Sequence, residues 1–281
     1  MQVTKVHGCG NDFVLIGDLG DALDVSSNVV RALCDRHRGV GGDGVIRVAP
    51  PHDAVSDVFM DYRNADGGIV EMCGNGVRCV ASYLLNRGLL RGDVVRVGSR
   101  AGVKTVCVTA RDRTGRVTET EVDMGVPEPT GTITLRMPTA DGNDMIDVEA
   151  AMVSMGNPHA VIAVDDLDKA PVATWGPRIE HDPAFADGTN VEFITVPSDD
   201  VVHGRIWERG VGETLASGTG ASAMAVAAHL SGRAGRDVRV HVPGGVLHAH
   251  WGDETLLIRG PAVEVFDADI DDAWLDGVAS A

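Results

Sequence analysis

Hydrophobic and polar residues alternate in short runs along most of the chain, which is the pattern of half-buried β-strands. These runs are rich in Val, Ile and Thr, and Gly, Pro and Asp separate them as turn residues. We therefore expect a protein built largely of β-structure. The expected strands are residues 12–18, 44–50, 55–64, 116–125, 190–198, 237–245 and 254–266.

Two longer segments have apolar residues at helical spacing instead. The first follows Gly76 and ends near Gly88, and the second follows Gly220 and ends near Gly232. Glycine just past the last apolar residue is a common helix stop. A shorter capped surface helix is expected over residues 26–39.

The two long helices begin alike, and this indicates an internal duplication. CGNG at 73–76 aligns with SGTG at 217–220, an offset of about 144 residues. Each tetrapeptide precedes an apolar helix and then a strand with a glycine turn. An offset this long does not fit a solenoid of short repeats.

The duplication predicts an α/β fold with two pseudo-symmetric lobes. Each lobe is expected to be a curved, mostly antiparallel sheet or barrel around a central helix. The expected lobes are 1–118 with the return of the C-terminal segment 264–281, and 119–263, with a crossing near the Pro-bearing stretch 124–132.

Composition narrows the class of protein. The 281 residues carry 24 basic and 41 acidic side chains, a formal net charge of −17. This charge repels nucleic acid and anionic membrane surfaces on average. No run of 18 apolar residues is present, so no membrane-spanning helix is expected.

The cysteines and the start of the chain indicate a cytoplasmic protein. The five cysteines are odd in number and fit no metal-binding spacing, so we expect reduced thiols and no metal. The first residues lack the apolar segment of a secretory signal. Cys79 is expected to pack in the core, and Cys9, Cys34 and Cys107 to be structural.

A G-x-G turn before a helix presents backbone N–H groups at the positive end of the helix dipole, which suits an anion. Neither loop has the lysine of a phosphate-binding P-loop. Cys73 adds chemistry to the first loop, because a cysteine at a helix start has a larger thiolate fraction and can act as a base. The alternative for Cys73 is a small buried apolar residue.

Two such helix starts facing one another would suit one reaction. They would bind a carboxylate and stabilise the charge that develops when the neighbouring carbon loses a proton. A base on each face of that carbon would invert it, with no metal or cofactor.

Five segments, taken together, resemble diaminopimelate epimerase. They are HGCGNDFVLI (7–16), RNADGGIVEMCGNGVRC (63–79), MGNPHA (155–160), DGTNVEF (187–193) and WERGVGETLASGTGASA (207–223). The resemblance spans nearly the whole chain. It implies a cofactor-independent isomerase that converts LL-2,6-diaminopimelate to the meso form for lysine and peptidoglycan synthesis, and a homodimer.

The resemblance also implies the site. Catalytic roles fall to Cys73 and Ser217, with His159 and Glu208 as auxiliary acid–base residues. Glycines 74 and 218, Asn75 and Thr219 would bind the reacting carboxylate. The remaining substrate-binding residues are Asn11, Asn64, Asn157, Asn190, Glu208 and Arg209. Arginine pairs with a carboxylate through two hydrogen bonds, and asparagine offers both a donor and an acceptor to a zwitterion.

Ser217 is the large departure, because the family carries a second cysteine there. A serine hydroxyl is a much weaker acid than a thiol and a poor base at neutral pH. Three explanations stay open: an introduced Cys→Ser change, a natural epimerase that uses Ser217, water or His159 on that face, or a divergent relative. Gly44 is a smaller departure, since some members carry a polar residue there.

Three other functions remain as alternatives. The first is an amino-acid racemase or epimerase of other specificity. The second is a non-catalytic amino-acid-binding relative, which Cys73 argues against. A nucleotide-binding enzyme is disfavoured because the P-loop lysine is absent.

Overall fold

The computed structural model describes residues 1–139 and 142–279, and these form two compact units. The N-terminal unit is Met1–Val122 together with the C-terminal residues from Gly260, and the C-terminal unit is Asp123–Arg259. The chain passes from one unit to the other within β8 (Val117–Gly125) and returns within β17 (Leu256–Pro261).

The N-terminal unit is a sheet in the order β18–β1–β2–β3–β4–β6–β7–β8. The β2–β3 and β4–β6 pairs are parallel, and the other neighbours in this order are antiparallel. Its elements besides β8 are β1 (Gln2–Gly8), β2 (Asn11–Gly17), α1 (Ser27–Cys34), β3 (Gly44–Ala49), β4 (Val58–Asn64), β5 (Ile69–Val70), α2 (Gly74–Asn86), β6 (Val94–Ser99), β7 (Gly102–Arg111), β18 (Val263–Asp269) and α5 (Asp272–Ala279).

The C-terminal unit repeats this plan in the order β9–β10–β11–β12–β13–β15–β16–β17. Here β11–β12 and β13–β15 are the parallel pairs. Its elements besides β17 are β9 (Glu128–Pro138), β10 (Met145–Ser154), β11 (Pro158–Ala163), α3 (Val172–Glu180), β12 (Asn190–Ser198), β13 (Val201–Glu208), β14 (Gly212–Thr214), α4 (Gly218–Leu230), β15 (Asp237–Val242) and β16 (Gly245–Trp251).

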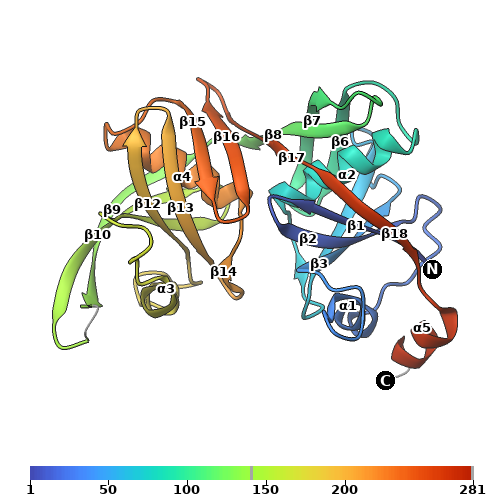
Figure 1. Cartoon of the computed structure of the whole chain (residues 1–281), viewed down its shortest axis with the longest axis horizontal. Helices are drawn as coiled ribbons and strands as arrows, with labels where there is room; N and C mark the ends of the chain where they lie inside the picture. Colours follow the sequence, from blue (N-terminus) through green and yellow to red (C-terminus); the bar gives the residue numbers. More distant parts are fainter. Residues whose placement is uncertain (140–141, 280–281) are drawn as a thin grey trace. The chain divides into compact units, whose positions relative to one another are not determined.

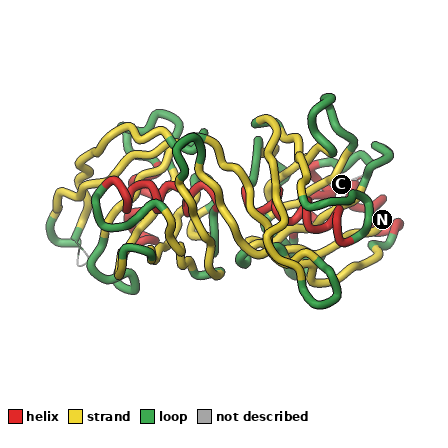
Figure 2. The backbone as a smooth tube through the Cα atoms, turned by 90° about the horizontal axis from the view of Figure 1, so that it is seen from above, coloured by secondary structure: helices red, strands yellow, loops and turns green. Residues whose placement is uncertain are grey.

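Each unit contains two parallel strand pairs, and two parallel neighbours can be joined only by a crossover connection. A helix lies in each of these connections: α1 and α2 in the first unit, α3 and α4 in the second (Figure 1). Each long helix, α2 and α4, lies among the strands of its own unit (Figure 2). The predicted α/β fold class, with a curved sheet around a central helix in each half, is confirmed.

The helices α2 and α4 are the centres of the two cores. Most of their residues are buried, so they contact strands on several sides. Both begin three residues before the predicted start, because the first glycine of each G-x-G is already helical. Gly88 and Gly232 follow the last turns with φ of +67° and +70°, the left-handed conformation that glycine adopts at no steric cost.

Some element boundaries differ from the sequence predictions. The helix expected over 26–39 ends at Cys34, because Asp35 is extended. The strand expected over 254–266 divides at Ala262 into β17 and β18, which lie in different parts of the fold. The helices α3 and α5 and the β9–β10 hairpin were not predicted.

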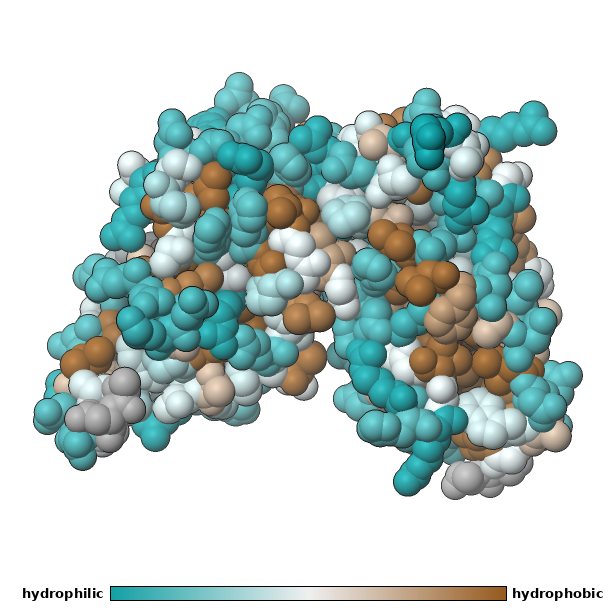
Figure 3. Space-filling view, in the orientation of Figure 1, coloured by the Kyte–Doolittle hydropathy of each residue, from teal (hydrophilic) through white to brown (hydrophobic). Residues whose placement is uncertain are grey.

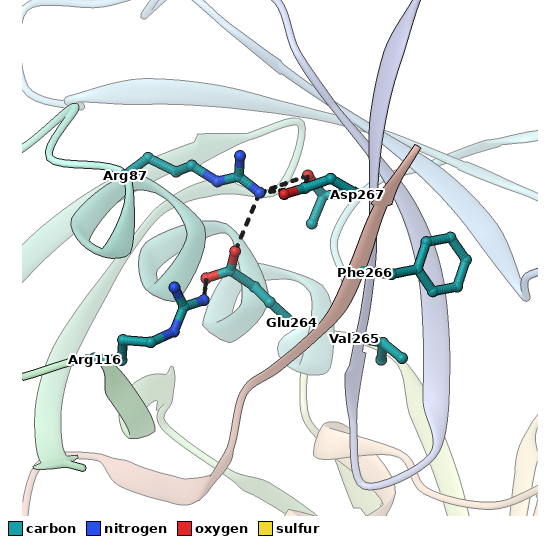
Figure 4. Close-up of a pocket in the computed structure, with 7 residues that line it drawn as sticks. Arg87, Arg116, Glu264, Val265, Phe266 and Asp267 are labelled. Atoms are coloured by element: carbon teal, nitrogen blue, oxygen red, sulfur yellow. Dashed lines mark hydrogen bonds and ion pairs between the residues drawn. The ribbon is translucent and has the colours of Figure 1, made fainter. Parts of the chain in front are cut away.

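Ion pairs attach β18 to the end of α2 at a surface pocket of about 270 Å³ (Figure 4). Glu264 accepts a hydrogen bond from Asn86 at 2.7 Å and pairs with Arg116 at 3.1 Å and with Arg87 at 3.4 Å. Arg87 also contacts Asp267. The pocket's charged groups thus pair with one another, and they hold the returning C-terminal segment in the N-terminal unit.

Candidate active site

Cys73 is the N-cap residue of α2, and its backbone is extended, with φ −139° and ψ 117°. The sulfur accepts a hydrogen bond from the Gly76 N–H at 3.4 Å. Its side chain therefore stands at the positive end of the helix dipole, where a thiolate is stabilised.

Cys73 is less buried than three of the other four cysteines. Cys9, Cys34 and Cys79 are buried, and burial raises the pKa of each, to about 12 for Cys34 and Cys79. Cys73 and Cys107 are half-buried, and burial also raises the pKa of Cys107. Since Cys107 lies within β7, Cys73 is the accessible thiol at a helix start.

Asn11 connects Cys73 to the rest of the N-terminal unit. Its Oδ1 lies 3.7 Å from Cys73 Sγ and 3.0 Å from Asn75 Nδ2, and it accepts from both groups. Its Nδ2 donates to Asp43 Oδ2 at 2.8 Å. The side chain of Asn75 is thus part of a protein network, and the backbone N–H groups of Gly74 and Asn75 are the loop donors that point along the helix axis.

Asn64 ends β4 and accepts a hydrogen bond from the Tyr62 hydroxyl at 2.8 Å. Tyr62 also explains the glycine at position 44. A Cβ on Gly44 would lie 2.4 Å from the Arg63 carbonyl oxygen and 2.5 Å from the Tyr62 ring. This strand pairing therefore leaves no room for a polar side chain at position 44.

Ser217 occupies the same place in the C-terminal unit. It is the N-cap of α4, with φ −135° and ψ 132°, and its Oγ accepts from the Gly220 N–H at 3.2 Å. Serine is among the best N-cap residues. The hydroxyl thus keeps the capping role of a residue at this position.

His159 is paired with a buried carboxylate close to this loop. Its Nδ1 lies 2.7 Å from Glu192 Oε1, and neither side chain is exposed. Burial raises the pKa of Glu192, and His159 opposes the rise. A Cβ on Gly220 would lie 3.0 Å from Glu192 Oε1, so the buried pair packs directly against the helix start.

Hydrogen bonds connect this pair to Ser217. The His159 Nε2 lies 3.1 Å from Asn157 Oδ1, and Asn157 Nδ2 donates to Thr219 Oγ1 at 3.4 Å. Thr219 Oγ1 lies 3.4 Å from Ser217 Oγ. We call Glu192, His159, Asn157, Thr219 and Ser217 the His159 chain.

Glu208 is the last residue of β13, and Arg209 begins the turn to β14. Thr214 Oγ1 donates to Glu208 Oε1 at 2.5 Å. Asn190 Oδ1 accepts from the Arg209 backbone N–H at 3.0 Å, and its Nδ2 donates to the Pro158 carbonyl at 2.9 Å. Asn190 therefore fixes the backbone of the Arg209 turn.

Several charged residues of these sites were not predicted from the sequence. Glu180 is buried and accepts from Trp207 Nε1 at 2.7 Å and from the Gly210 N–H at 2.8 Å, which holds the same turn. Asp43, Arg78 and Glu192 were also missed. The available signal was a charged residue within an apolar or glycine-rich segment, as in NVEF and CGNGVRC.

Neither a metal site nor a membrane span is found in the part of the chain that the structure describes. Within residues 1–139 and 142–279, no three His, Cys, Asp or Glu side chains converge as metal ligands would. Over the same ranges, every helix is too short or too polar to cross a bilayer.

The fold has known relatives among solved structures. A probable proline racemase from Agrobacterium radiobacter covers 96% of this chain and 93% of its own, with a TM-score of 0.70 and 16% identity. A PhzF-family phenazine biosynthesis protein from Bacillus anthracis has the same TM-score at 17% identity, over 96% and 99% of the two chains. At this identity the likeness concerns the fold.

Sequence comparison is more specific. The profile described as diaminopimelate epimerase matches residues 3–129 and 151–265. The diaminopimelate epimerase of Desulfovibrio desulfuricans is 43% identical over 96% of this chain and 98% of its own length. That of Heliobacterium modesticaldum is 42% identical over 96% and 99%. The chain is therefore an amino-acid isomerase that belongs to the diaminopimelate epimerase family.

Proposed function

We propose that this chain epimerises LL-2,6-diaminopimelate to meso-diaminopimelate by proton transfer at the α-carbon, without a cofactor. The observation that carries the proposal is the place of Cys73. A half-buried thiol caps α2 and meets the Gly76 N–H, in a chain more than 40% identical to diaminopimelate epimerases.

Cys73 serves one face of the α-carbon as base or acid. Backbone N–H groups of Gly74 and Asn75, and of Gly218 and Thr219, bind the adjacent carboxylate. These donors strengthen their hold as negative charge develops on the deprotonated carbon, which is how preorganised N–H groups lower such a barrier.

The far end of the substrate carries an ammonium and a second carboxylate. Arg209 binds this carboxylate, and Glu208 binds the ammonium. Asn11, Asn64, Asn157 and Asn190 complete the set. The hydrogen bonds from Thr214 to Glu208 and from the Arg209 backbone N–H to Asn190 support this assignment.

By the family pattern, Ser217 takes the position of the second acid or base, which serves the opposite face of the carbon. Its hydroxyl loses a proton far less readily than a thiol, so inversion is slow in this chain. The His159 chain orients the Ser217 hydroxyl through Asn157 and Thr219, which keeps His159 as an auxiliary residue.

The setting of the reaction also follows from the family. We place the enzyme in the cytoplasm, in lysine and peptidoglycan synthesis, as a homodimer with a small-molecule substrate. In support of self-association, Val263, Val265 and Phe266 of β18 are exposed, and Figure 3 shows hydrophobic side chains gathered on this face of the N-terminal unit. Light scattering of the purified chain tests the dimer.

Substrate identity is tested with the Ser217→Cys form, because the thiol removes the rate limit at that face. We expect this form to epimerise LL-diaminopimelate about 100-fold or more faster than the parent chain, the scale of one acid–base group. Lysine, ornithine, glutamate and proline serve as the comparison panel. Faster turnover of one of these than of diaminopimelate would assign the chain to another amino acid.

A further inference from the structure

Four side chains of the N-terminal unit form a continuous hydrogen-bond chain through the loop of Cys73. Arg78 Nη2 donates to Asn75 Oδ1 at 2.8 Å, Asn75 Nδ2 donates to Asn11 Oδ1 at 3.0 Å, and Asn11 Nδ2 donates to Asp43 Oδ2 at 2.8 Å. We call Arg78, Asn75, Asn11 and Asp43 the Asn11 chain.

The two ends of the Asn11 chain fix its direction. A guanidinium has donors only, and an ionised carboxylate has acceptors only. Each amide between them must therefore present its oxygen toward Arg78 and its nitrogen toward Asp43. A rotation of either amide by 180° would place donor against donor or acceptor against acceptor.

Further contacts fix the side chains of Arg78 and Asp43 at the two ends of the Asn11 chain. Arg78 has no exposed surface, and its Nη1 reaches the Gly74 carbonyl at 3.5 Å. A Cβ on Gly8 would lie 3.1 Å from Arg78 Nη2, so this glycine makes room for the guanidinium. Asp43 accepts from Arg36 Nη2 at 2.8 Å and from the Asp12 N–H at 3.1 Å.

Cys73 meets this chain at the Asn11 oxygen. The 3.7 Å contact suits a thiol, whose S–H donates to Oδ1. A thiolate in the same place would face the lone pairs of an oxygen. We propose that Arg78 and Asp43 are positioning residues that keep Asn11 Oδ1 toward Cys73, so that the resting cysteine is held as the protonated thiol.

This orientation opposes the helix start, which favours the thiolate through the Gly76 N–H. The role of this contact in catalysis rests on the proposed function. An ammonium group of the substrate that binds Asn11 Oδ1 would compete with the Cys73 thiol for this acceptor. Substrate binding would then favour the thiolate at the moment a base is needed. The charged and titratable groups around the cysteine and the Asn11 chain include Arg78 and Cys79 of α2, Cys9 of the β1–β2 turn, Glu119 of β8 and Glu264 of β18. Lys5, Asp12 and Arg36 lie behind Asp43.

The experiment measures Cys73 alkylation by iodoacetamide between pH 6 and pH 10, without substrate, with peptide mapping by mass spectrometry. Asp43→Ala removes the acceptor of Asn11 Nδ2, so only Asn75 then directs the Asn11 amide and turning its nitrogen toward sulfur becomes less costly. We expect Cys73 to react about threefold to tenfold faster at pH 7.5, which equals a fall of half to one pH unit in its midpoint. Alkylation of Cys107, on β7, is the internal reference and stays unchanged.

Asp43→Asn is the matched control. Its side-chain oxygen still accepts from Asn11, so the direction of the chain is kept while the negative charge is lost. We expect Cys73 of this form to react within twofold of the parent chain.

Two results overturn the proposal. One is an unchanged pH profile in Asp43→Ala, and the other is the same shift in both variants, which would assign the effect to charge alone. If Asp43→Ala does not fold, Asn11→Leu removes the acceptor itself and must accelerate alkylation in the same way. Because no substrate is used, failure of the epimerase assignment leaves this test intact.

Discussion

The two halves of the molecule place a hydrogen-bond chain behind the same kind of helix start, but the two chains differ in what ends them. The Asn11 chain runs between a guanidinium and a carboxylate, so its direction is fixed. The His159 chain runs between a buried His–Glu pair and two hydroxyl groups. The hydroxyl groups of Thr219 and Ser217 can each donate or accept, so this end of the His159 chain has no fixed direction.

A single residue at equivalent positions of the two units accounts for this difference. At the fourth residue after the first helix glycine, the N-terminal unit has Arg78 and the C-terminal unit has Ser222, which donates to the Gly218 carbonyl at 2.9 Å. One permanent charge at this position separates a hydrogen-bond chain of fixed direction from one whose hydroxyl end can turn.

His159→Leu should produce the largest loss of stability. Removing His159 leaves the buried Glu192 carboxylate without its hydrogen-bonding partner, which costs about 3–5 kcal/mol of the free energy of unfolding at pH 8. The loss should shrink toward pH 4, because the pKa of Glu192 is already raised by burial and a protonated carboxyl needs no counter-charge. Urea unfolding at several pH values measures it.

The double variant His159→Leu, Glu192→Leu is the control, because it removes both buried partners together. It should recover most of the stability and lose the pH dependence. An equal loss for His159→Leu at pH 4 and pH 8 would contradict a charge-based cost.

Asp12 gives the opposite pH dependence in the N-terminal unit. Burial raises its pKa, but hydrogen bonds from Arg36 and Lys5 outweigh burial and lower the pKa from 3.8 to about 2. The lowered value contributes about 2 kcal/mol of stability above pH 4, which is lost as the pH falls toward 2. Asp12→Asn should therefore flatten the acid limb of the stability curve, and an unchanged slope would show that Asp12 is not coupled to folding.

Alanine substitutions at Gly76 and Gly220, the second glycines of the two loops, should show the smallest difference in stability. A Cβ at Gly76 would lie 3.0 Å from the terminal methyl of Ile46, which can turn aside. At Gly220 it would meet Glu192 Oε1 at 3.0 Å and Ser217 Cβ at 3.1 Å, and both side chains are held by hydrogen bonds. We expect Gly220→Ala to cost about 1–3 kcal/mol and Gly76→Ala less than about 1 kcal/mol. Thermal unfolding of both variants checks the order.

Much of the duplicated fold could be predicted from the sequence. The aligned CGNG and SGTG segments gave the duplication and both central helices, because a cap, two glycines and an apolar stripe are local signals. The strand expected over 190–198 coincides with β12. The β9–β10 hairpin was missed because its residues are largely exposed and show little alternation.

The residues behind the site could not be predicted in the same way. Asp43 lies 32 residues from Asn11, and Glu192 lies 33 residues from His159, so no local pattern connects them. Their roles depend on strand pairing: β11 and β12 are parallel neighbours, and this register places His159 beside Asn190, two residues before Glu192. Glu180 likewise accepts a hydrogen bond from the Gly210 N–H, 30 residues further along the chain.

The two halves are chemically unequal in this proposal, in which Cys73 is the effective base. The direct test is incubation of the parent chain with LL- and with meso-diaminopimelate in heavy water. We expect one isomer to take up deuterium with its configuration retained, about tenfold or more faster than it inverts. Cys73→Ser should abolish both processes. Inversion as fast as deuterium uptake, at the rate of the Ser217→Cys form, would contradict the account.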